Sequence, residues 1–102
     1  MKRFTTPHLT FSTPFLATSV EEAYITFRQG AKTVLEKSTE DGLVVSDYSL
    51  SLDLTQEETG KFAPNGAPLV EIQGRVKLVG GDVAASNIIE REIGRVLKGG
   101  VI

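Results

Sequence analysis

The chain has 102 residues, enough for one domain and too few for two, so we expect residues 1–102 to form a single domain. Its net charge is -2 and its Lys and Arg residues are scattered singly, which predicts no nucleic-acid partner and no membrane partner. The lack of cysteine excludes disulfides and thiolate metal sites.

Export and membrane insertion are not indicated either. No apolar run approaches the roughly 18–20 residues that cross a bilayer. The opening segment, MKRFTTPHLTF, has two positive charges but lacks the apolar core of a signal peptide. We therefore expect the protein to be made and folded in the cytoplasm.

The first predicted strand is His8–Ser12, in which Leu9 and Phe11 fall on one face. Because Pro7 and Pro14 bracket it and proline cannot donate to a ladder, the strand should be short or lie at a sheet edge.

A hairpin is predicted next. Ala23, Ile25 and Phe27 share one face of a strand over 22–28, Gln29-Gly30 forms a turn, and 32–37 pairs back. The rival interpretation is a helix over 20–35, which a central Gly30 and the neighbouring β-branched and aromatic residues disfavour.

The clearest pattern in the sequence extends from 48 to 78 and follows a polar turn and a short apolar run. Residues 38–42, STEDG, form a polar turn, and 43–46 is a short strand or the start of the next one. Alternation then predicts a strand with one face in the core, and that face consists of Tyr48, Leu50, Leu52 and Leu54. Thr55 and Glu58 match a capping box, which predicts one helical turn near 56–61 with Phe62 as its core anchor.

After a predicted loop at 63–68, with Asn65-Gly66 as its turn, the next strand alternates again. Its inner face consists of Val70, Ile72, Val76 and Leu78. The interior Gly74 indicates a bulge or the close approach of an aromatic ring. A turn at Gly80-Gly81 follows.

The last segment, 84–97, has two interpretations. Some apolar residues fit helical spacing, but Gly94 disfavours a helix by about 1 kcal/mol relative to Ala, and the preceding Gly-Gly turn favours a hairpin. We expect one long, partly exposed strand, followed by a tail at 99–102 that is mobile or docks on a neighbour.

Short strands separated by turn residues at roughly 8–12-residue spacing predict an all-β fold. We expect an antiparallel, Ig-like β-sandwich of about six or seven strands.

The sequence offers little chemistry. His8 is the sole histidine, and a surface or structural role is expected for it. The acidic residues lack calcium-loop spacing, and no phosphate or dinucleotide motif is present. We therefore predict no catalytic residue, no cofactor and no metal site.

Five segments carry a family resemblance: TTPHLTF, YITFRQG, LTQEETGKF, VEIQGRVKLVGGD and SNIIEREIGRVLKGGVI. Together they resemble a set of small uncharacterised proteins encoded in prophages of Firmicutes. More distantly, the pattern is similar to the N-terminal β-sandwich of phage baseplate upper proteins. The resemblance implies an Ig-like sandwich and a phage structural or accessory role near the tail, with the virion as a further location. It implies no catalytic residues.

The leading hypothesis is a non-enzymatic structural or adaptor protein that acts through protein–protein contacts, with phage structural proteins or further copies of itself as partners. The candidate interface consists of Glu90, Arg91, Glu92, Ile93, Arg95, Val101 and Ile102. The alternative is a small-ligand or carbohydrate-binding module, which would need exposed aromatic rings such as Tyr24 and Tyr48. A third hypothesis, an enzyme, requires a cleft that holds His8 beside a carboxylate.

Overall fold

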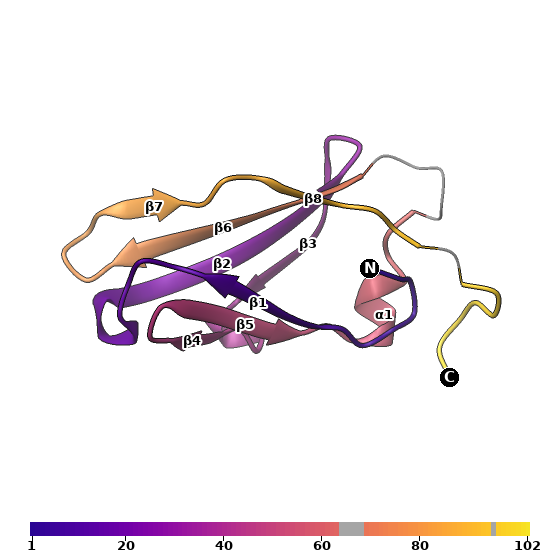
Figure 1. The fold of residues 1–102 in the computed structure, drawn as a ribbon, viewed down its shortest axis with the longest axis horizontal. Coiled ribbons are helices and arrows are strands. Elements are labelled where there is room, and N and C mark those ends of the chain that lie inside the picture. The colour runs from indigo at the N-terminus through magenta and orange to yellow at the C-terminus, as the bar shows by residue number, and fades with distance from the viewer. Residues whose placement is uncertain (64–68, 95) are drawn as a thin grey trace.

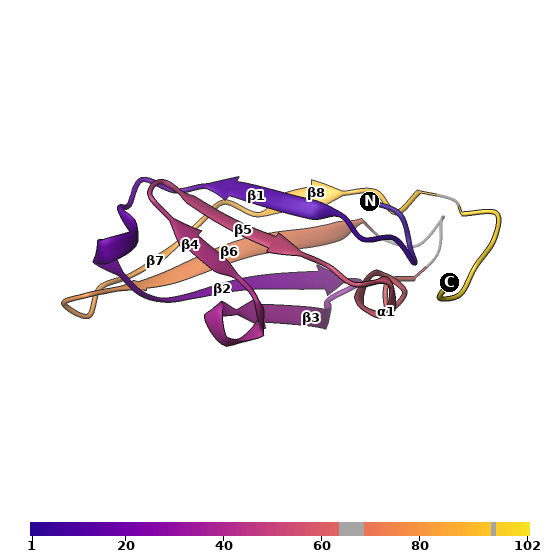
Figure 2. The same ribbon diagram turned by 90° about the horizontal axis from the view of Figure 1, so that it is seen from below.

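The computed structural model describes residues 1–63, 69–94 and 96–102 and forms two antiparallel sheets packed face to face (Figures 1 and 2). The predicted all-β antiparallel sandwich is confirmed. The elements in chain order are β1 (His8–Ser12), η1 (Ala17–Ser19), β2 (Val20–Gln29), β3 (Lys32–Ser38), η2 (Thr39–Asp41), β4 (Val44–Ser46), β5 (Ser49–Asp53), α1 (Gln56–Thr59), β6 (Val70–Leu78), β7 (Val83–Ala85) and β8 (Ile89–Arg91).

The smaller sheet has the order β1-β5-β4, and the larger has the order β3-β2-β6-β7, with β8 pairing beside β7 on β6. The segment that contains η2 carries the chain from β3 in the larger sheet to β4 in the smaller one. Consequently β4 and β3 are joined on one side of the sandwich, while β1 and β7 are edge strands on the other (Figure 2).

The core is formed by the inner faces of both sheets. Alternation in β2 buries Ala23, Ile25 and Phe27 completely, as predicted. From β5 and β6 come Leu50, Leu52, Val70, Ile72 and Val76, and β3 adds Leu35. The rings of Phe27 and Phe62 lie 5.9 Å apart at 59°, a tilted contact that joins the larger sheet to the segment after α1.

The hairpin of β2 and β3 rules out the rival helix over 20–35. Gly30 and Ala31 have φ of 60° and 63°, the backbone that a type I′ two-residue turn requires. The register shifts between Phe27 and Arg28 at a β-bulge, which bends the strand near its end.

The predicted capping box and helical turn are confirmed. Thr55 Oγ1 accepts from the Glu58 amide at 3.2 Å, and Glu58 Oε1 accepts from the Thr55 amide at 2.9 Å. Phe62 is buried, as expected. Thr59, which is fully buried, exchanges two hydrogen bonds with the Thr5 backbone, at 3.0 and 2.9 Å, and so ties the N-terminal segment to α1.

Three sequence expectations need correction. Tyr48 is not a core residue: its φ is 61°, it sits in the turn between β4 and β5, and it is 56% exposed. A positive φ breaks the alternation, so the buried series begins at Leu50. Leu78 is only half-buried. Gly74 is approached by the aliphatic Ile25, whose Cδ1 would lie 3.3 Å from an added Cβ, rather than by an aromatic ring.

The last segment is neither a helix nor one long strand. It forms β7 and β8, both paired antiparallel to β6, with residues 86–88 between them. The Gly80-Gly81 turn before it is confirmed, with φ of 119° and 100°. The loop predicted at 63–68, with its Asn65-Gly66 turn, falls almost entirely outside the described residues.

A half-buried ion pair joins β3 to α1: Lys37 Nζ donates to Glu58 Oε2 at 2.7 Å, with the two side chains 13% and 16% exposed. Burial alone raises the pKa of Glu58. The hydrogen bond from Lys37, the bonds from Thr55 and the charge of Lys37 outweigh burial, so the pKa of Glu58 is lowered overall.

We predict that Thr59→Val destabilises the fold by about 1–3 kcal/mol, because valine keeps the volume but leaves the partly buried Thr5 amide without an acceptor. Urea unfolding measures the loss. Thr59→Ser, which retains the hydroxyl, is the matched control and should lose less. Equal stability of wild type and the valine variant would contradict the role given to this hydroxyl.

We also predict an acid-sensitive contribution from Glu58. A carboxylate whose folded pKa lies below its ordinary 4.5 stabilises the fold above that pH and loses its contribution as pH falls through the folded value. Glu58→Gln keeps the capping box but removes the charge that pairs with Lys37. At neutral pH the substitution should therefore lower the free energy of unfolding by roughly 1–2 kcal/mol. Its unfolding free energy should also decline less below pH 4.5 than that of wild type. Glu57→Gln, on the exposed side of the same turn, should follow wild type; parallel pH curves for all three proteins would refute the prediction.

Candidate functional site

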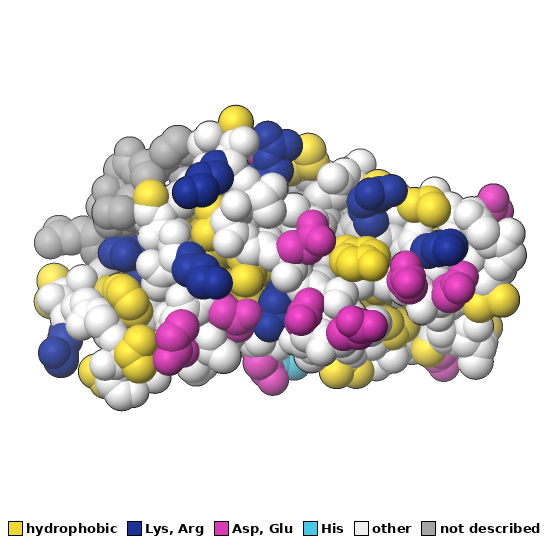
Figure 3. All heavy atoms as spheres, turned by 180° about the vertical axis from the view of Figure 1, so that it is seen from behind, with side chains coloured by type: hydrophobic (Ala, Val, Ile, Leu, Met, Phe, Trp, Pro, Cys, Tyr) yellow, Lys and Arg dark blue, Asp and Glu magenta, His cyan; other side chains and the backbone are white. Residues whose placement is uncertain are grey.

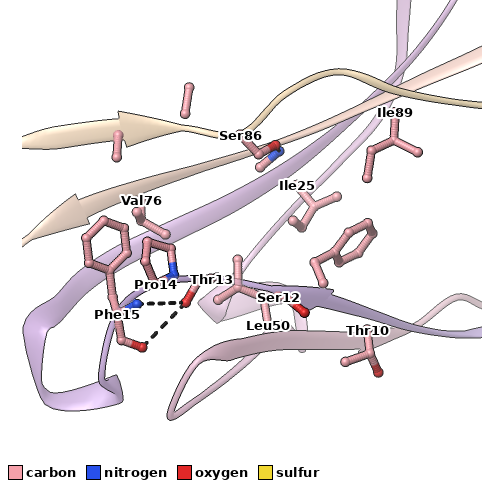
Figure 4. A pocket seen from close by; sticks show the side chains of 14 residues that line it. Thr10, Ser12, Thr13, Pro14, Phe15, Ile25, Leu50, Val76, Ser86 and Ile89 are labelled. Atoms are coloured by element: carbon pink, nitrogen blue, oxygen red, sulfur yellow. Dashed lines mark hydrogen bonds between the residues drawn. The ribbon is translucent and has the colours of Figure 1, made fainter.

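A cavity of about 290 Å³ lies on the open side of the sandwich, between the β1 edge of one sheet and the β7 edge of the other (Figure 4). It is lined by Thr10, Phe11, Ser12, Thr13, Pro14, Phe15, Ile25, Leu50, Gly74, Val76, Ala84, Ala85, Ser86 and Ile89. The lining therefore draws on both sheets and on the connection that follows β1.

The cavity presents a carbon surface. None of its lining residues is charged, and the rings of Phe11 and Phe15 are only half-buried. The polar side chains in the lining are partly occupied within the protein: Ser86 Oγ accepts from the Gly74 amide at 2.9 Å, and Thr13 Oγ1 bonds to the Phe15 backbone (Figure 4). An occupant would therefore be apolar, because a charged group here would lose its hydration without gaining a partner.

One rim of the cavity is the unpaired edge of β1. Residue pairs in an antiparallel ladder alternate between hydrogen-bonded and non-bonded. The Thr13 amide donates to Tyr48 and the Leu54 amide donates to Pro7, so in the register of β1 with β5 the odd-numbered residues bond to β5. The backbone N–H and C=O groups of His8, Thr10 and Ser12 consequently point away from β5.

The side chains of β1 point alternately to the two faces of the smaller sheet, rather than outward from its edge. His8, Thr10 and Ser12 are exposed on the outer face of the smaller sheet, and Figure 4 shows Thr10 directed away from the cavity. Leu9 and Phe11, between them, face inward and pack against the core. The proline-bracketed pattern predicted a short or edge strand, and β1 is both: it pairs with β5 alone.

The opposite rim is shorter. The Leu78 amide donates to Asp82 and the Ser86 amide donates to Gly74, which places Asp82, Ala84 and Ser86 in bonded pairs with β6. The backbone groups of Val83 and Ala85 therefore face outward. The cavity is bounded on both sides by backbone that can bond to an added chain.

The residues of the predicted interface are dispersed. Glu90, Arg91 and Glu92 are exposed at β8, and Val101 and Ile102 are exposed in the tail. Ile93 is 4% exposed and belongs to the core, because alternation past β8 turns it inward. Arg95 lies outside the described residues.

His8 has a carboxylate partner. Its Nδ1 lies 2.7 Å from Asp53 Oδ1, and its Nε2 lies 3.4 Å from Thr10 Oγ1. Carboxylate, imidazole and hydroxyl stand in the order of an acyl-transfer triad. The third hypothesis also required a cleft, but the His8 and Asp53 side chains are 63% and 78% exposed on the outer face, and neither residue lines the cavity.

The two tyrosines are both exposed, as the ligand-binding hypothesis requires, but they are not neighbours. Tyr24 lies on the outer face of β2 and Tyr48 in the β4–β5 turn. The face in Figure 3 shows basic and acidic side chains interspersed with hydrophobic ones, rather than a field of one sign.

Within residues 1–63, 69–94 and 96–102, no three His, Asp or Glu side chains gather closely enough to hold a metal ion. Over the same residues, every helix is too short or too polar to cross a membrane. Comparisons with protein-family models, with curated proteins and with solved structures found no match for the chain. The prophage resemblance stays a prediction.

We predict that Ala84→Phe fills the cavity. The half-buried Ala84 lines it from β7, so a phenyl ring there should abolish the fluorescence gain of the uncharged apolar dye N-phenyl-1-naphthylamine without loss of stability. Val83→Phe places the same ring on the opposite, exposed face of β7 and serves as the control. Equal dye binding by both variants would show that the dye does not enter the cavity.

Proposed function

We propose that the protein is a non-enzymatic binding module of structural or adaptor type, which takes an extended, uncharged segment of a partner protein along the open side of its sandwich. One observation carries the proposal: an uncharged cavity is bordered by the unpaired backbone edge of β1. Edge pairing supplies affinity in such recognition, and alternate side chains that enter a pocket supply specificity.

The dimensions of the site suit a strand. The free edge offers backbone groups at His8, Thr10 and Ser12, so a short partner strand has several bonds available to it. Every second side chain of that strand would point into the cavity, and the remainder would stay on the outer face with Thr10 and Ser12. The cavity is large enough for a few aliphatic side chains, but not for a domain.

The setting in a phage particle, near the tail or baseplate, is part of this proposal and is supported by the sequence resemblance alone. Phage structural proteins or further copies of the chain are the partners that follow from it. The face in Figure 3, seen from behind relative to Figure 1, mixes basic and acidic side chains, and such mixed charge fits contacts with other proteins better than contacts with a polyanion.

A small apolar ligand is the second candidate. The cavity volume, about 290 Å³, lies near the lower end of ordinary ligand pockets, and its lining is mainly carbon. A carbohydrate fits less well, because Tyr24 and Tyr48 form no common platform. Native mass spectrometry of the purified protein separates the candidates: a bound small molecule favours the ligand, and an empty protein favours the peptide.

Binding of short peptides selected from a displayed random library tests the proposed function. We expect the selected peptides to alternate uncharged apolar residues and to bind about five- to tenfold more weakly to Thr10→Pro, which removes one outward N–H group. Thr10→Ala, which keeps that N–H, is the matched control. Charged consensus peptides, or equal affinity for both variants when urea unfolding shows both to be folded, would overturn the proposal.

A further inference from the structure

The segment 96–102 carries apolar side chains that the rest of the fold does not cover. Leu97 and Ile102 are 94% and 87% exposed, Val101 is 53% exposed, and Val96 is 38% exposed. Apolar side chains concentrated in one short exposed stretch are typical of a contact surface. Figure 1 shows this segment beyond α1, apart from both sheets.

Its backbone is held at one point. The Gln56 side chain donates to the Ile102 carbonyl at 2.9 Å and accepts from the Ile102 amide at 2.8 Å, as a neighbouring strand would. No other backbone group of residues 96–102 is hydrogen-bonded within the described part of the chain, so the segment retains backbone groups for a further partner. In its own molecule this contact places Ile102 beside α1, whereas the cavity is lined further along by residues 10–15.

We propose that residues 96–102 of one copy pair with the β1 edge of a second copy and place Leu97 and Val101 in its cavity. This inference rests on the proposed function and names the partner. In an extended strand, Leu97, Gly99 and Val101 share one face, which carries no charge and matches the uncharged lining.

The charges agree with the same orientation. Lys98 then falls on the opposite face and lies with His8, Thr10 and Ser12 on the outer side of the smaller sheet. The Asp53 carboxylate is 78% exposed on that side, in the strand next to β1. In this orientation Lys98 lies on the same side of the sheet as the Asp53 carboxylate. The reversed orientation would bury Lys98 in a carbon-lined cavity.

Each copy offers one groove and one tail, so the contact is heterologous. Reciprocal exchange between two copies closes a dimer, and exchange along a series of copies gives an open chain. In either case association depends on protein concentration, and the same side chains are lost from solvent.

Directed crosslinking tests the pairing, and the absence of natural cysteine removes background. An affinity-tagged Thr10→Cys copy is mixed with an untagged Lys98→Cys copy under mild oxidation, since both positions lie on the outer face of the paired strands. We expect an intermolecular disulfide between these two proteins. A Thr18→Cys copy, exposed in η1, is the control and should not crosslink with Lys98→Cys.

Introducing Leu97→Asp and Val101→Asp into the Lys98→Cys copy should abolish the crosslink. The same two substitutions in the otherwise wild-type chain should convert its self-associated form, measured by sedimentation, to monomer. Equal crosslinking through Thr18→Cys, or only an internal disulfide in a Thr10→Cys/Lys98→Cys chain, would overturn the inference. If the tail variants associate as wild type does while Thr10→Pro still weakens the selected peptides, the tail inference fails and the proposed function stands. If Thr10→Pro leaves peptide binding unchanged, the proposed function fails as well.

Discussion

The structure depends on the antiparallel ladder between β2 and β6. Its register runs from Val20 opposite Leu78 to Gln29 opposite Val70, and it places the buried Ala23 and Phe27 of β2 opposite the buried Val76 and Ile72 of β6. Because side chains alternate with a period of two, a slip by one residue would turn the whole inner face to water. With this pairing fixed, β3, β7 and β8 have places to attach, and the smaller sheet has a surface on which to pack.

Where local pattern decides structure, the sequence was sufficient to predict it. Alternation located β1, β2, β5 and β6, the Gln29-Gly30 turn signal located β3, and the Thr55 capping box located α1, because these signals depend on neighbours within a few residues. Tyr48 was misassigned because alternation continues through it, while its positive φ depends on the turn that joins two strands. The split of the last segment into β7 and β8 was missed for a similar reason: it depends on pairing with β6, far away in sequence.

Almost none of the candidate site could be predicted from the sequence. Its cavity exists because the order β1-β5-β4 leaves β1 at an edge, opposite the β7 edge of the other sheet, and sheet order is a long-range property. Only the prolines around β1 indicated an edge strand. The Lys37–Glu58 ion pair and the His8–Asp53 pair, 21 and 45 residues apart in sequence, follow from packing rather than from a motif.

The two rims of the open side differ in regularity, and the difference decides which of them suits an added strand. From Gly74 to Ile72 the β6 strand advances two residues, while its partner advances three, from Ser86 to Ile89, so the outer edge formed by β7 and β8 contains an extra residue. An interrupted edge is a poor template for a long added strand, which is how natural sheets resist indiscriminate edge-to-edge aggregation. The larger sheet is thereby protected at the edge where β1 of the smaller sheet is not. Growth by strand addition would consequently be polar, with each added chain facing the same way.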